Sequence, residues 1–534
     1  MSPVLYLLAL CLFLPLYPIV KKLYKQRCLA ALPGPKSTSV LFGVAREMYA
    51  PFSMPFRMSL YTGFGRVVKI PLLFGEYVLA VSDPVALAAL LKHDTTFELP
   101  DFVREMTWVT WGPNLVAVSG DEHHKQRKML NPAFSVARLR TFVPDINAVS
   151  QLLVDTLKTY TTSGTAEVDV SQLYSGFALE CTGRTGLGQS FGPLTEDGTP
   201  HSRALKEFGP TISKLRMFVP YIPWARRTFP RSWLAWAAKH APIRAVRDTY
   251  RISETAFASA AEIYNEKAGD VSDGTGKDLM SIVVRQNKLA PPADALSKDS
   301  LIGQISMFFF GATDTTSSTL SRITELLATH PGVQARLREE ITEATEGAGK
   351  ALVDFDYEAF GSLQYLDAII RETLRMYPVL QGSNRMSDVD AVLPLSEPIV
   401  GTDGKAITEL FVPAGTLVIG NNVGYNYDTA IWGADAHEWR PERWLAPLPE
   451  SVTDNKAHGM YSYHMGFGGG VRACIGYSMA LIMLRIAVSH LIMAFKLAPS
   501  EKEIVWRMAG VLSPTVKGST LKRPTMPVLL THIQ

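Results

Sequence analysis

One cysteine in this sequence stands in a setting that suits metal chemistry. Cys474 lies near the end of a loop, residues 466–476, that holds five glycines in eleven residues, so the backbone can turn tightly and approach a ligand closely. An apolar run, residues 477–495, follows; as a helix it would hold Cys474 at its first turn, where the helix dipole favours a thiolate. Arg472 adds a positive charge. A free cysteine is often a small buried hydrophobe, but that interpretation leaves the glycines and the arginine unexplained. We expect a thiolate ligand for a soft metal centre such as haem iron.

A second group of reactive side chains lies inside a long apolar segment. Residues 297–329 predict one helix that ends at His330–Pro331, and its centre holds Asp314 and Thr315 among further hydroxyl side chains. An acid and hydroxyls are costly inside an apolar helix unless they have partners. Taken alone, the run predicts a Ser/Thr-rich kink, at which the helical hydrogen bonds break locally and water inserts.

Two charged pairs have helical spacing. His123 and Arg127 lie four residues apart in a polar run, so they share one face of the helix expected there. Glu372 and Arg375 lie one helical turn apart. Taken alone, the first pair is typical of a solvated polar helix. The second is typical of a surface ion pair worth a few tenths of a kcal/mol.

The cysteine loop identifies a family. Its fixed positions are Phe467-x-x-Gly470-x-Arg472-x-Cys474-x-Gly476. This pattern resembles the haem-binding loop of the cytochrome P450 superfamily, and every fixed position is present. The family's other landmarks follow in order over residues 33–534, so the resemblance covers essentially the whole chain. It implies a mainly α fold with a small β-rich lobe, a helical prism that holds one haem b ligated by Cys474.

The resemblance also assigns roles to the other groups. Side chains that would bind the haem propionates are Arg472, Arg385, Arg127 and His123. Many members have tryptophan where His123 stands, but histidine can still donate a hydrogen bond. Asp314 and Thr315 would stand on the open face of the haem and relay protons for oxygen activation. Ala312 replaces the glycine of most members, which implies only a tighter groove.

A structural network completes the family pattern. The sequence Pro441-Glu442-Arg443-Trp444 resembles the family's meander motif. The resemblance implies that Arg443 joins Glu372 and Arg375 in a buried network that clamps the segment leading to the cysteine loop. Arg385 follows a strand-like start at residues 378–380. Met483 stands where relatives often have glutamate, and we do not count that position as essential.

Other elements must position these residues. Residues 66–82 are rich in β-branched side chains and broken at Phe74–Gly75, which predicts a hairpin. A helix capped by Asp83 is expected over residues 84–93. The aromatic-rich stretch 99–118 is expected to be irregular, and the resemblance implies that it lines the substrate pocket.

The middle of the chain, residues 140–290, predicts successive amphipathic helices. Residues 205–243 within it mix arginines with aromatic side chains, namely Phe208, Phe218, Tyr221, Trp224, Phe229, Trp233 and Trp236. Core packing is one explanation for these rings. The other is an amphipathic lid that dips into a membrane interface, where aromatic rings and basic side chains gather.

The amino-terminal sequence is typical of a membrane anchor. Residues 3–20 carry no charge, and a basic flank, residues 21–27, follows before the first acid, Glu47. The length just reaches the span of a bilayer helix, and two prolines near its end leave a shallower interfacial anchor as an alternative. A cleaved signal peptide would place its positive charges before the apolar run, whereas this order predicts a cytosolic body. We expect an anchor over residues 1–31 and one haem-thiolate catalytic domain over residues 32–534.

Composition limits the remaining function classes. A net charge of +3 in 534 residues implies no nucleic-acid partner. The four cysteines show no paired or Cys-x-x-Cys spacing, which favours a reducing compartment and argues against a disulfide framework or a zinc site.

The resemblance implies a single-pass monooxygenase of the endoplasmic reticulum membrane. It would use dioxygen to hydroxylate a lipophilic small molecule such as a terpenoid, in the style of fungal members that tailor secondary metabolites. Electrons would come from an NADPH–haemoprotein reductase docking on a basic side near Lys125 and Lys128. A haem-thiolate isomerase or dehydratase, or a non-catalytic haem protein, would share the fold. Neither needs a proton relay, so the intact pair of Asp314 and Thr315 favours the monooxygenase.

Overall fold

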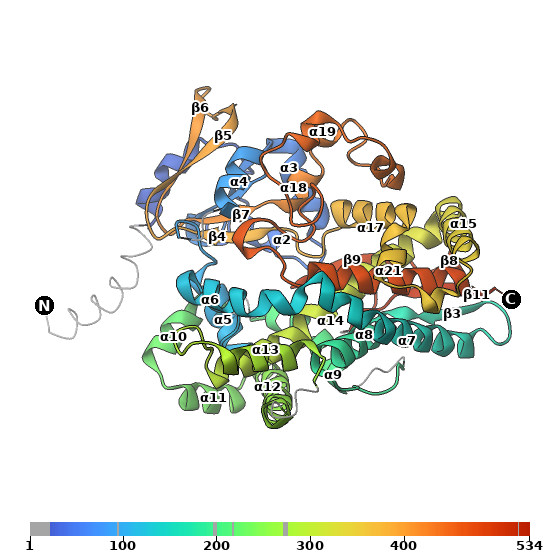
Figure 1. Cartoon of the computed structure of the whole chain (residues 1–534). Coiled ribbons are helices and arrows are strands. Elements are labelled where there is room, and N and C mark those ends of the chain that lie inside the picture. The colour runs from blue at the N-terminus through green and yellow to red at the C-terminus, as the bar shows by residue number, and fades with distance from the viewer. Residues whose placement is uncertain are drawn as a thin grey trace, which may run out of the picture. The chain divides into compact units, whose positions relative to one another are not determined.

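The computed structural model describes residues 22–92, 95–195, 200–215, 218–270, 276–521 and 523–533. The predicted anchor, residues 3–20, lies outside them. The chain divides into two compact units, whose helices and strands are labelled in Figure 1. The first unit comprises Met1–Pro100, Gln381–His437 and Pro449–Ala473. The second comprises Asp101–Leu380, Glu438–Leu448 and Cys474–Gln534.

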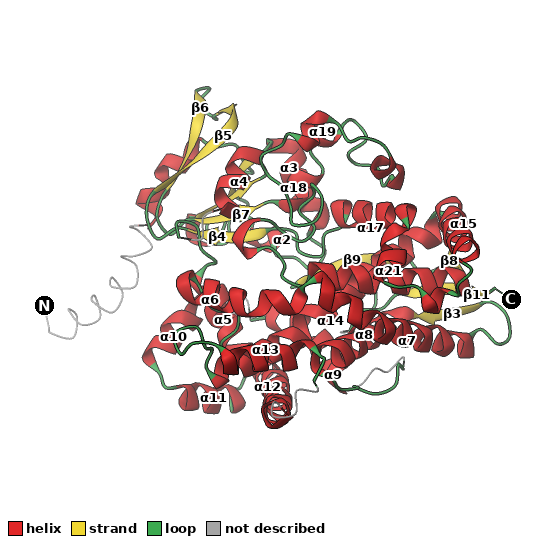
Figure 2. Cartoon of the chain, in the orientation of Figure 1, coloured by secondary structure: helices red, strands yellow, loops and turns green. Residues whose placement is uncertain are grey.

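The first unit combines short helices with two sheets (Figure 2). Its main sheet has the strand order β1-β2-β7-β4, and β5 pairs with β6 in a separate ribbon. The strands are β1 (Val67–Pro71), β2 (Tyr77–Val81), β4 (Ser383–Met386), β5 (Ala391–Val400), β6 (Ala406–Val412) and β7 (Leu417–Gly420). The α-helices are α2 (Ala45–Met48), α3 (Met54–Phe64), α4 (Pro84–Lys92), α18 (Asn422–Asn426), α19 (Thr429–Trp432) and α20 (Glu450–Thr453). The 3-10 turns are η1 (Gln26–Ala31), η2 (Leu73–Gly75) and η8 (Gly470–Arg472).

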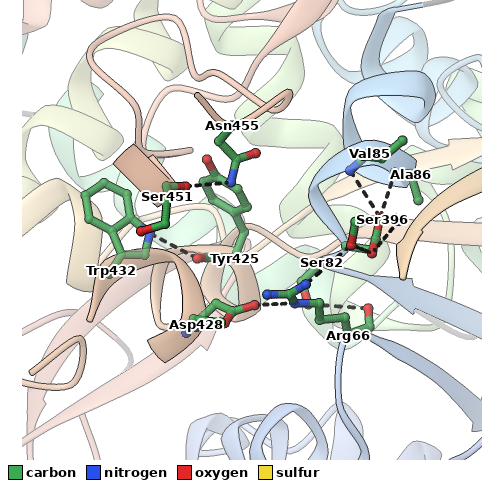
Figure 3. Close-up of polar contacts among 12 residues, drawn as sticks. Arg66, Ser82, Val85, Ala86, Ser396, Tyr425, Asp428, Trp432, Ser451 and Asn455 are labelled. Carbon is green, nitrogen blue, oxygen red and sulfur yellow. Dashed lines mark hydrogen bonds and ion pairs between the residues drawn. The ribbon is translucent and has the colours of Figure 1, made fainter. Parts of the chain in front are cut away.

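The predicted hairpin and the helix after it are both confirmed. β1 pairs antiparallel with β2, and Phe74 and Gly75 at the turn both have positive φ. Asp83 caps α4, because its Oδ1 accepts hydrogen bonds from the backbone N–H groups of Val85 and Ala86 at 3.1 and 3.0 Å. The same carboxylate accepts a bond from the N–H of Ser396 at 3.1 Å, so the cap also holds β5 (Figure 3).

A second set of polar contacts holds the segment after β7. Arg66, just before β1, pairs with Asp428, the N-cap of α19, with Nε and Oδ2 2.6 Å apart (Figure 3). The indole Nε1 of Trp432 donates to the carbonyl of Tyr425 at 3.1 Å. These bonds satisfy buried polar groups around a completely buried tryptophan, so they fix the chain path between α18 and α19.

The second unit is mainly helical. Its first helices are α5 (Asp101–Trp111), α6 (Gly120–Leu130), α7 (Val136–Tyr160), α8 (Val170–Cys181), α9 (Pro200–Ser213), α10 (Ile222–Thr228), α11 (Arg231–Lys239), α12 (Arg244–Asp270) and α13 (Leu279–Leu289). The later ones are α14 (Lys298–Thr329), α15 (Pro331–Ala348), α16 (Tyr357–Ser362), α17 (Gln364–Met376) and α21 (Tyr477–Ala494). Short turns are η3 (Asn131–Phe134), η4 (Thr182–Leu187, a π-helix), η5 (Val219–Tyr221), η6 (Leu352–Asp354) and η7 (Pro441–Leu445).

Two small sheets complete the second unit. The strands are β3 (Ala166–Asp169), β8 (Phe495–Pro499), β9 (Ile504–Ala509), β10 (Val511–Val516) and β11 (Pro527–His532). β11 lies between β3 and β8, and β9 pairs with β10, all antiparallel. The predicted class, mainly α with a small β-rich lobe, is confirmed. Residues 140–290 form the predicted succession of helices, with one short strand, β3, among those described.

The long helix α14 is confirmed, but the predicted local break is not. α14 is continuous from Lys298 to Thr329, and the side chain of Ser297 caps it by accepting from the N–H of Ser300. The hydroxyls of Thr315 and Thr319 donate to carbonyls four residues earlier, at 2.7 and 3.0 Å. These hydroxyls therefore find partners inside the intact helix and do not open it.

The stretch expected to be irregular is largely helical, so that prediction was wrong. Residues 101–111 form α5, bracketed by Pro100 on one side and Gly112–Pro113 on the other. The hydroxyls of Thr107 and Thr110 donate to carbonyls four residues earlier at 2.8 Å. Their burial with Trp111 against the unit stabilises a helix that local aromatic content does not favour.

The helix after the cysteine is a core helix. Among the described residues, α21 is the one helix long and apolar enough to cross a bilayer by length and composition, and 67% of its 18 residues are buried. It packs against α7, α14 and α15. Its apolar surface is therefore largely satisfied within the second unit.

Folding stability should depend on a buried histidine in α21. The Nε2–H of His490 donates to Oδ1 of Asn147 in α7 at 3.0 Å, while Nδ2 of Asn147 donates to the carbonyl of Val353. Burial lowers the pKa of His490 from its ordinary value of 6.5 to about 4. Its stabilising contribution is therefore full above about pH 6.5 and is lost as the pH falls toward 4, a loss of about 3 kcal/mol.

Replacing His490 tests that dependence. His490→Gln keeps an amide donor for Asn147 but cannot titrate, so the acid slope of the unfolding free energy between pH 6.5 and 4 should flatten. Chemical denaturation at a series of pH values measures it. Substitution of the exposed His532 by glutamine is the control and should leave the slope as in the parent chain. An unchanged slope in His490→Gln would assign the acid sensitivity to other groups.

Candidate functional site

Cys474 lies just outside a helix rather than in its first turn. α21 starts at Tyr477, and Gly476 is its N-cap with φ −92° and ψ 13°. Cys474 has solvent-accessible surface, but many protein atoms lie behind it. The loss of solvent on that side is the largest influence on the pKa of its thiol and raises it. The backbone N–H of Gly476 and the guanidinium of Arg127 act in the opposite direction. The predicted helix-end stabilisation is therefore present but outweighed, and a metal cation is what would hold this sulfur as a thiolate.

A single cysteine is the candidate metal ligand. Across the described ranges, no group of three or more His, Cys, Asp or Glu residues could hold a bare metal ion. In the second unit Cys181 is the other cysteine, and it is completely buried. An accessible thiol without other protein ligands suits a metal whose remaining ligands belong to a cofactor, as in haem.

The helix α6 places the predicted pair on its inner side. His123 is buried and Arg127 is half-buried, while the intervening His124 is exposed. Burial lowers the pKa of Arg127, and its interaction with Cys474 opposes that shift. The structure thus brings Arg127 close enough to Cys474 for the two to interact electrostatically. Their spacing in the sequence does not predict this proximity.

A buried amide pair, which no local pattern in the sequence predicted, holds α6 against α14. Nε2 of Gln304 donates to Oε1 of Gln126 at 2.6 Å, and Oε1 of Gln304 accepts from the N–H of Leu115. Both glutamines are buried. The pair sets the position of Arg127 relative to the long helix. On the outer side, Lys128 is exposed and pairs with Asp294 at 3.2 Å, and Lys125 is only half-buried.

An accessible stripe runs along the middle of α14. Phe308, Gly311, Ala312 and Thr315 are partly exposed and recur at helical spacing, whereas most of the remaining helix is buried. A Cβ added at Gly311 would meet no atom within 4 Å, so space lies beside the helix there. This accessible strip on an intact helix leaves room for a ligand beside α14.

The two predicted relay residues occupy different positions. Thr315 lies on the accessible stripe, with its hydroxyl donating to the carbonyl of Gly311. Asp314 is only 5% exposed. Thr315 is partly exposed on the open strip, whereas the side chain of Asp314 is packed against the protein behind it. That both residues stand on the open face of the haem stays a prediction.

Three aromatic rings gather next to this stripe. Trp111 of α5, Phe208 of α9 and Phe310 of α14 have ring centroids 4.8 to 5.2 Å apart. The sequence drew attention to Trp111 and Phe208 separately, but only packing shows that they meet on Phe310. Trp111 and Phe208 are buried, whereas Phe310 is partly accessible, so the cluster gives the helix an apolar ring next to the strip.

The predicted structural network forms inside the second unit. Glu372 and Arg375 are both 0% exposed and make two bonds, Nε–Oε2 at 2.9 Å and a terminal nitrogen to Oε1 at 2.7 Å. Nε of Arg443 lies 3.4 Å from Oε1 of Glu372. The carboxylate also accepts from the indole of Trp444 at 2.9 Å and from the N–H of Arg440 at 3.1 Å. One acid therefore joins α17 to the segment 438–448.

The glycine loop itself belongs to the first unit. Gly468 and Gly470 both have φ of 68°, and a Cβ at Gly470 would overlap the carbonyl of Leu91 at the end of α4. The N–H of Gly468 donates to the carbonyl of Met465 at 3.1 Å, which closes the turn. The ring of Phe467 lies edge-on to Tyr461. The backbone at positions 468 and 470 therefore requires glycine, as the glycine-rich sequence predicted.

The two remaining arginines also belong to the first unit. Arg385 lies in β4, is 4% exposed, and donates to the carbonyl of Asn384 at 2.9 Å. β4 begins at Ser383, later than the strand-like start expected at residues 378–380. Arg472 ends η8 and is half-buried. The structure brings Arg127 and Cys474 together in one unit, while Arg385 and Arg472 come from the other.

The aromatic segment after α9 is exposed. The rings of Phe218, Tyr221, Trp224, Trp233 and Trp236 are all exposed, whereas Phe208 is buried. Arginines fasten this segment to α5, because Arg227 pairs with Asp101 at 2.8 Å and the guanidinium of Arg226 lies 4.1 Å from the ring centre of Trp108. Core packing therefore explains Phe208, but it does not explain the rings of η5, α10 and α11.

Comparisons with known proteins assign the chain to a family. Residues 33–521 match the family model described as Cytochrome P450. The chain is 36% identical to cytochrome P450 monooxygenase 81 of Postia placenta over 509 residues, which are 93% of this chain and 92% of that protein. It is 35% identical over 514 residues to a ganoderic acid synthetase of Ganoderma lucidum, with 93% and 92% of the two chains covered.

Proposed function

The chain belongs to the cytochrome P450 family of haem-binding, oxygen-incorporating oxidoreductases, and from this premise we propose that it hydroxylates a lipophilic secondary metabolite. The observation that carries the proposal is the accessible stripe on α14, with Thr315 on it, in the unit that also presents Cys474. Members of this family bind small-molecule substrates and need a redox partner. A terpenoid is the substrate class we propose, because it is an apolar, largely hydrocarbon molecule. Its surface consists mostly of C–H bonds, which are the bonds that a hydroxylase acts on.

The residues present fit haem b. Cys474 would ligate the iron, and the cationic or donor side chains for the propionates would be Arg127, His123, Arg385 and Arg472. Phe467, Gly470 and Gly476 would shape the loop around the ligand, with the N–H of Gly476 directed at the sulfur. When bound, a thiolate-ligated haem supplies the electron-rich iron that activates dioxygen.

The chain's own residues would orient the substrate and move protons. The aromatic cluster of Trp111, Phe208 and Phe310 would exclude water from one side of the strip. The hydroxyl of Thr315 donates to the carbonyl of Gly311. By rotating about its χ1 bond, it would give up this hydrogen bond and donate its proton toward the open face, while Oγ1 accepts a proton from water. The carboxyl group of Asp314, which is buried one residue earlier, would pass protons on to the hydroxyl of Thr315.

The proposed partner and location follow from charge and sequence. We assign an NADPH–haemoprotein reductase as electron donor, docking near the exposed Lys128 of α6. Attachment to the endoplasmic reticulum membrane is supported by the uncharged residues 3–20 with their basic flank. The exposed aromatic rings of α10 and α11, next to several arginines, would rest on the same membrane.

Substitution of Thr315 tests the proposed reaction. Thr315→Ala should keep the haem spectrum and substrate binding but lower product formed per NADPH consumed, with the missing electrons recovered as hydrogen peroxide. A positioned proton donor typically contributes about 10²–10⁴-fold to the rate. The substrate for the assay comes from metabolite profiling of a host that expresses the chain with a reductase.

Two neighbouring threonines serve as controls. Thr319 makes the same backward bond to its helix but is buried, and Thr316 is buried beside Thr315, so neither hydroxyl can replace it on the strip. Thr316→Ala and Thr319→Ala should therefore retain coupling. If Thr315→Ala is equally coupled, or if the parent chain transforms a peroxide substrate without NADPH, the isomerase or dehydratase class replaces the monooxygenase.

A further inference from the structure

The helix α8 runs directly into a wider π-helical turn, η4, which lies beside α14. The turn covers Thr182–Leu187 and ends at Gly188, which is in the left-handed conformation with φ 65°. Oη of Tyr174 in α8 and Oγ1 of Thr324 in α14 share a buried hydrogen bond of 2.9 Å, so the two helices are fastened to each other. Turns of this kind are rare and occur frequently at functional sites. Here the turn brings the backbone of Gly186 against a ring of α14.

Gly186 leaves free the space that the ring of Phe308 occupies. Gly186 is buried, and a Cβ added to it would lie 2.1 Å from Cε1 and 2.9 Å from Cζ of that ring. Carbon atoms pack at about 3.5–4.0 Å, so no side chain fits at position 186 while the ring stays in place. The atoms in the way are at the far end of the Phe308 side chain. An added methyl group would therefore displace this ring more easily than it would separate the two helices.

Phe308 stands at one end of the accessible stripe on α14. It is partly exposed and lies one helical turn before Gly311. The ring of Phe134 in η3 lies edge-on to it, with 6.1 Å between the ring centroids. Phe134 also lies beside the N-cap of α21, because a Cβ added at Gly476 would be 3.6 Å from its Cε1. The two rings thus form an apolar edge between the stripe and the helix that follows Cys474.

The backbone of η4 is held in place by a buried carboxylate. Glu180, the residue before Cys181 in α8, is 1% exposed and pairs with Arg184 of the turn at 2.7 Å. It also accepts a hydrogen bond of 2.7 Å from the backbone N–H of Phe191, so it ties the turn to the segment that leaves it. A buried acid that keeps both partners resists displacement. A clash at position 186 is therefore relieved at the ring of Phe308.

We propose that Gly186 is a positioning residue for ligand selection: it holds the ring of Phe308 back against η4 and so sets how bulky a ligand the accessible stripe admits. The inference rests on the proposed function, because the substrate is expected at that stripe. A helical phenylalanine has two favourable χ1 rotamers, so a displaced ring has few positions to adopt. Phe134 occupies one side of the ring and η4 another. The accessible side is the stripe, so displacement of the ring narrows it.

The binding of two azoles to the haem-loaded protein tests this role. Imidazole and 4-phenylimidazole bind haem iron through the same kind of nitrogen atom but differ by a phenyl ring, and the shift of the main haem absorption band gives each Kd. Gly186→Ala should raise the ratio of the Kd for 4-phenylimidazole to the Kd for imidazole by at least about tenfold, the lower end of the effect of an apolar mismatch. Phe308→Ala should lower the ratio. The double variant should match Phe308→Ala, because no ring remains to be displaced.

Gly176→Ala is the matched control. Gly176 is also buried in α8, but a Cβ added there would meet the side chain of Leu194 at 3.0 Å, so this variant should keep the parent ratio. A general loss of stability would weaken the binding of both azoles alike and leave the ratio unchanged.

An unchanged ratio in Gly186→Ala overturns the inference, and so does a raised ratio that persists in the double variant. If Gly186→Ala yields no haem-loaded protein, Phe308→Ala decides, and an unchanged ratio there overturns the inference. These titrations need no turnover, so their outcome is independent of the coupling assay on Thr315. A parent chain that binds neither azole would refute the haem site itself, and the proposed function with it.

Discussion

Cys474→Ala is expected to abolish the thiolate-type absorption band of the reduced carbon monoxide complex, together with all monooxygenase activity. The reason is geometric as well as chemical. Cys474 presents an exposed sulfur beside Arg127 and the N–H of Gly476, and no bare-metal cluster of His, Cys, Asp or Glu among the described residues offers a substitute. Cys474→His should keep an iron ligand but lose the band, because imidazole lacks the charge of a thiolate.

The matched control uses the other cysteine of the same unit. Cys181 is completely buried in α8, so a group as large as haem cannot reach its sulfur, and burial also raises the pKa of its thiol well above the ordinary value. Cys181→Ala should retain the band in any protein that folds. Retention of the band in Cys474→Ala would remove the basis for the whole site. Loss of the band from a folded Cys474→Ala protein, whether or not it retains haem, is what the assignment requires.

Local patterns predicted those elements whose signals are contained in a few neighbouring residues. The hairpin around Phe74–Gly75, the Asp83 cap and the helix over residues 298–329 all follow from turn chemistry, capping or period. α5 was missed because its aromatic residues obscure the helical period, and its stability comes from Thr107, Thr110 and Trp111 packing on the unit. Short-range preference is a weak guide where tertiary contacts decide.

Motif spacing could select candidate residues for the site, but it could not give their arrangement. Motif spacing selected Cys474, Arg127 and Thr315, because the family pattern fixes their order along the chain. Motif spacing could not show that burial has a larger effect than the helix N-terminus on the pKa of the Cys474 thiol. It also could not show that Asp314 is buried on the side away from the strip that Thr315 faces. The amide pair of Gln126 and Gln304 joins residues far apart in sequence, which no local pattern records.

Arg375→Ala is expected to destabilise the second unit by roughly 3–5 kcal/mol, since it leaves a buried carboxylate without its main partner. Glu372 and Arg375 are both 0% exposed, so water cannot replace the lost bonds. Total stabilities of folded domains are about 5–15 kcal/mol, and the expected result is low yield, weak haem retention and early unfolding. Thermal unfolding followed by circular dichroism, with haem content measured in parallel, checks it.

The control and the reverse substitution make the argument specific. Arg371 lies on the same helix one turn earlier and pairs with Asp367 at 2.6 Å, but it is 33% exposed, so Arg371→Ala should cost no more than about 1 kcal/mol. Glu372→Ala should be at least as damaging as Arg375→Ala, because Glu372 is the common acceptor for Arg375, Arg443 and Trp444. It would strand two guanidinium groups, 0% and 4% exposed, in the interior. An Arg375→Ala protein as stable and as haem-loaded as Arg371→Ala would show that water reaches the network and that its charges do not hold α17 to the segment before the cysteine loop.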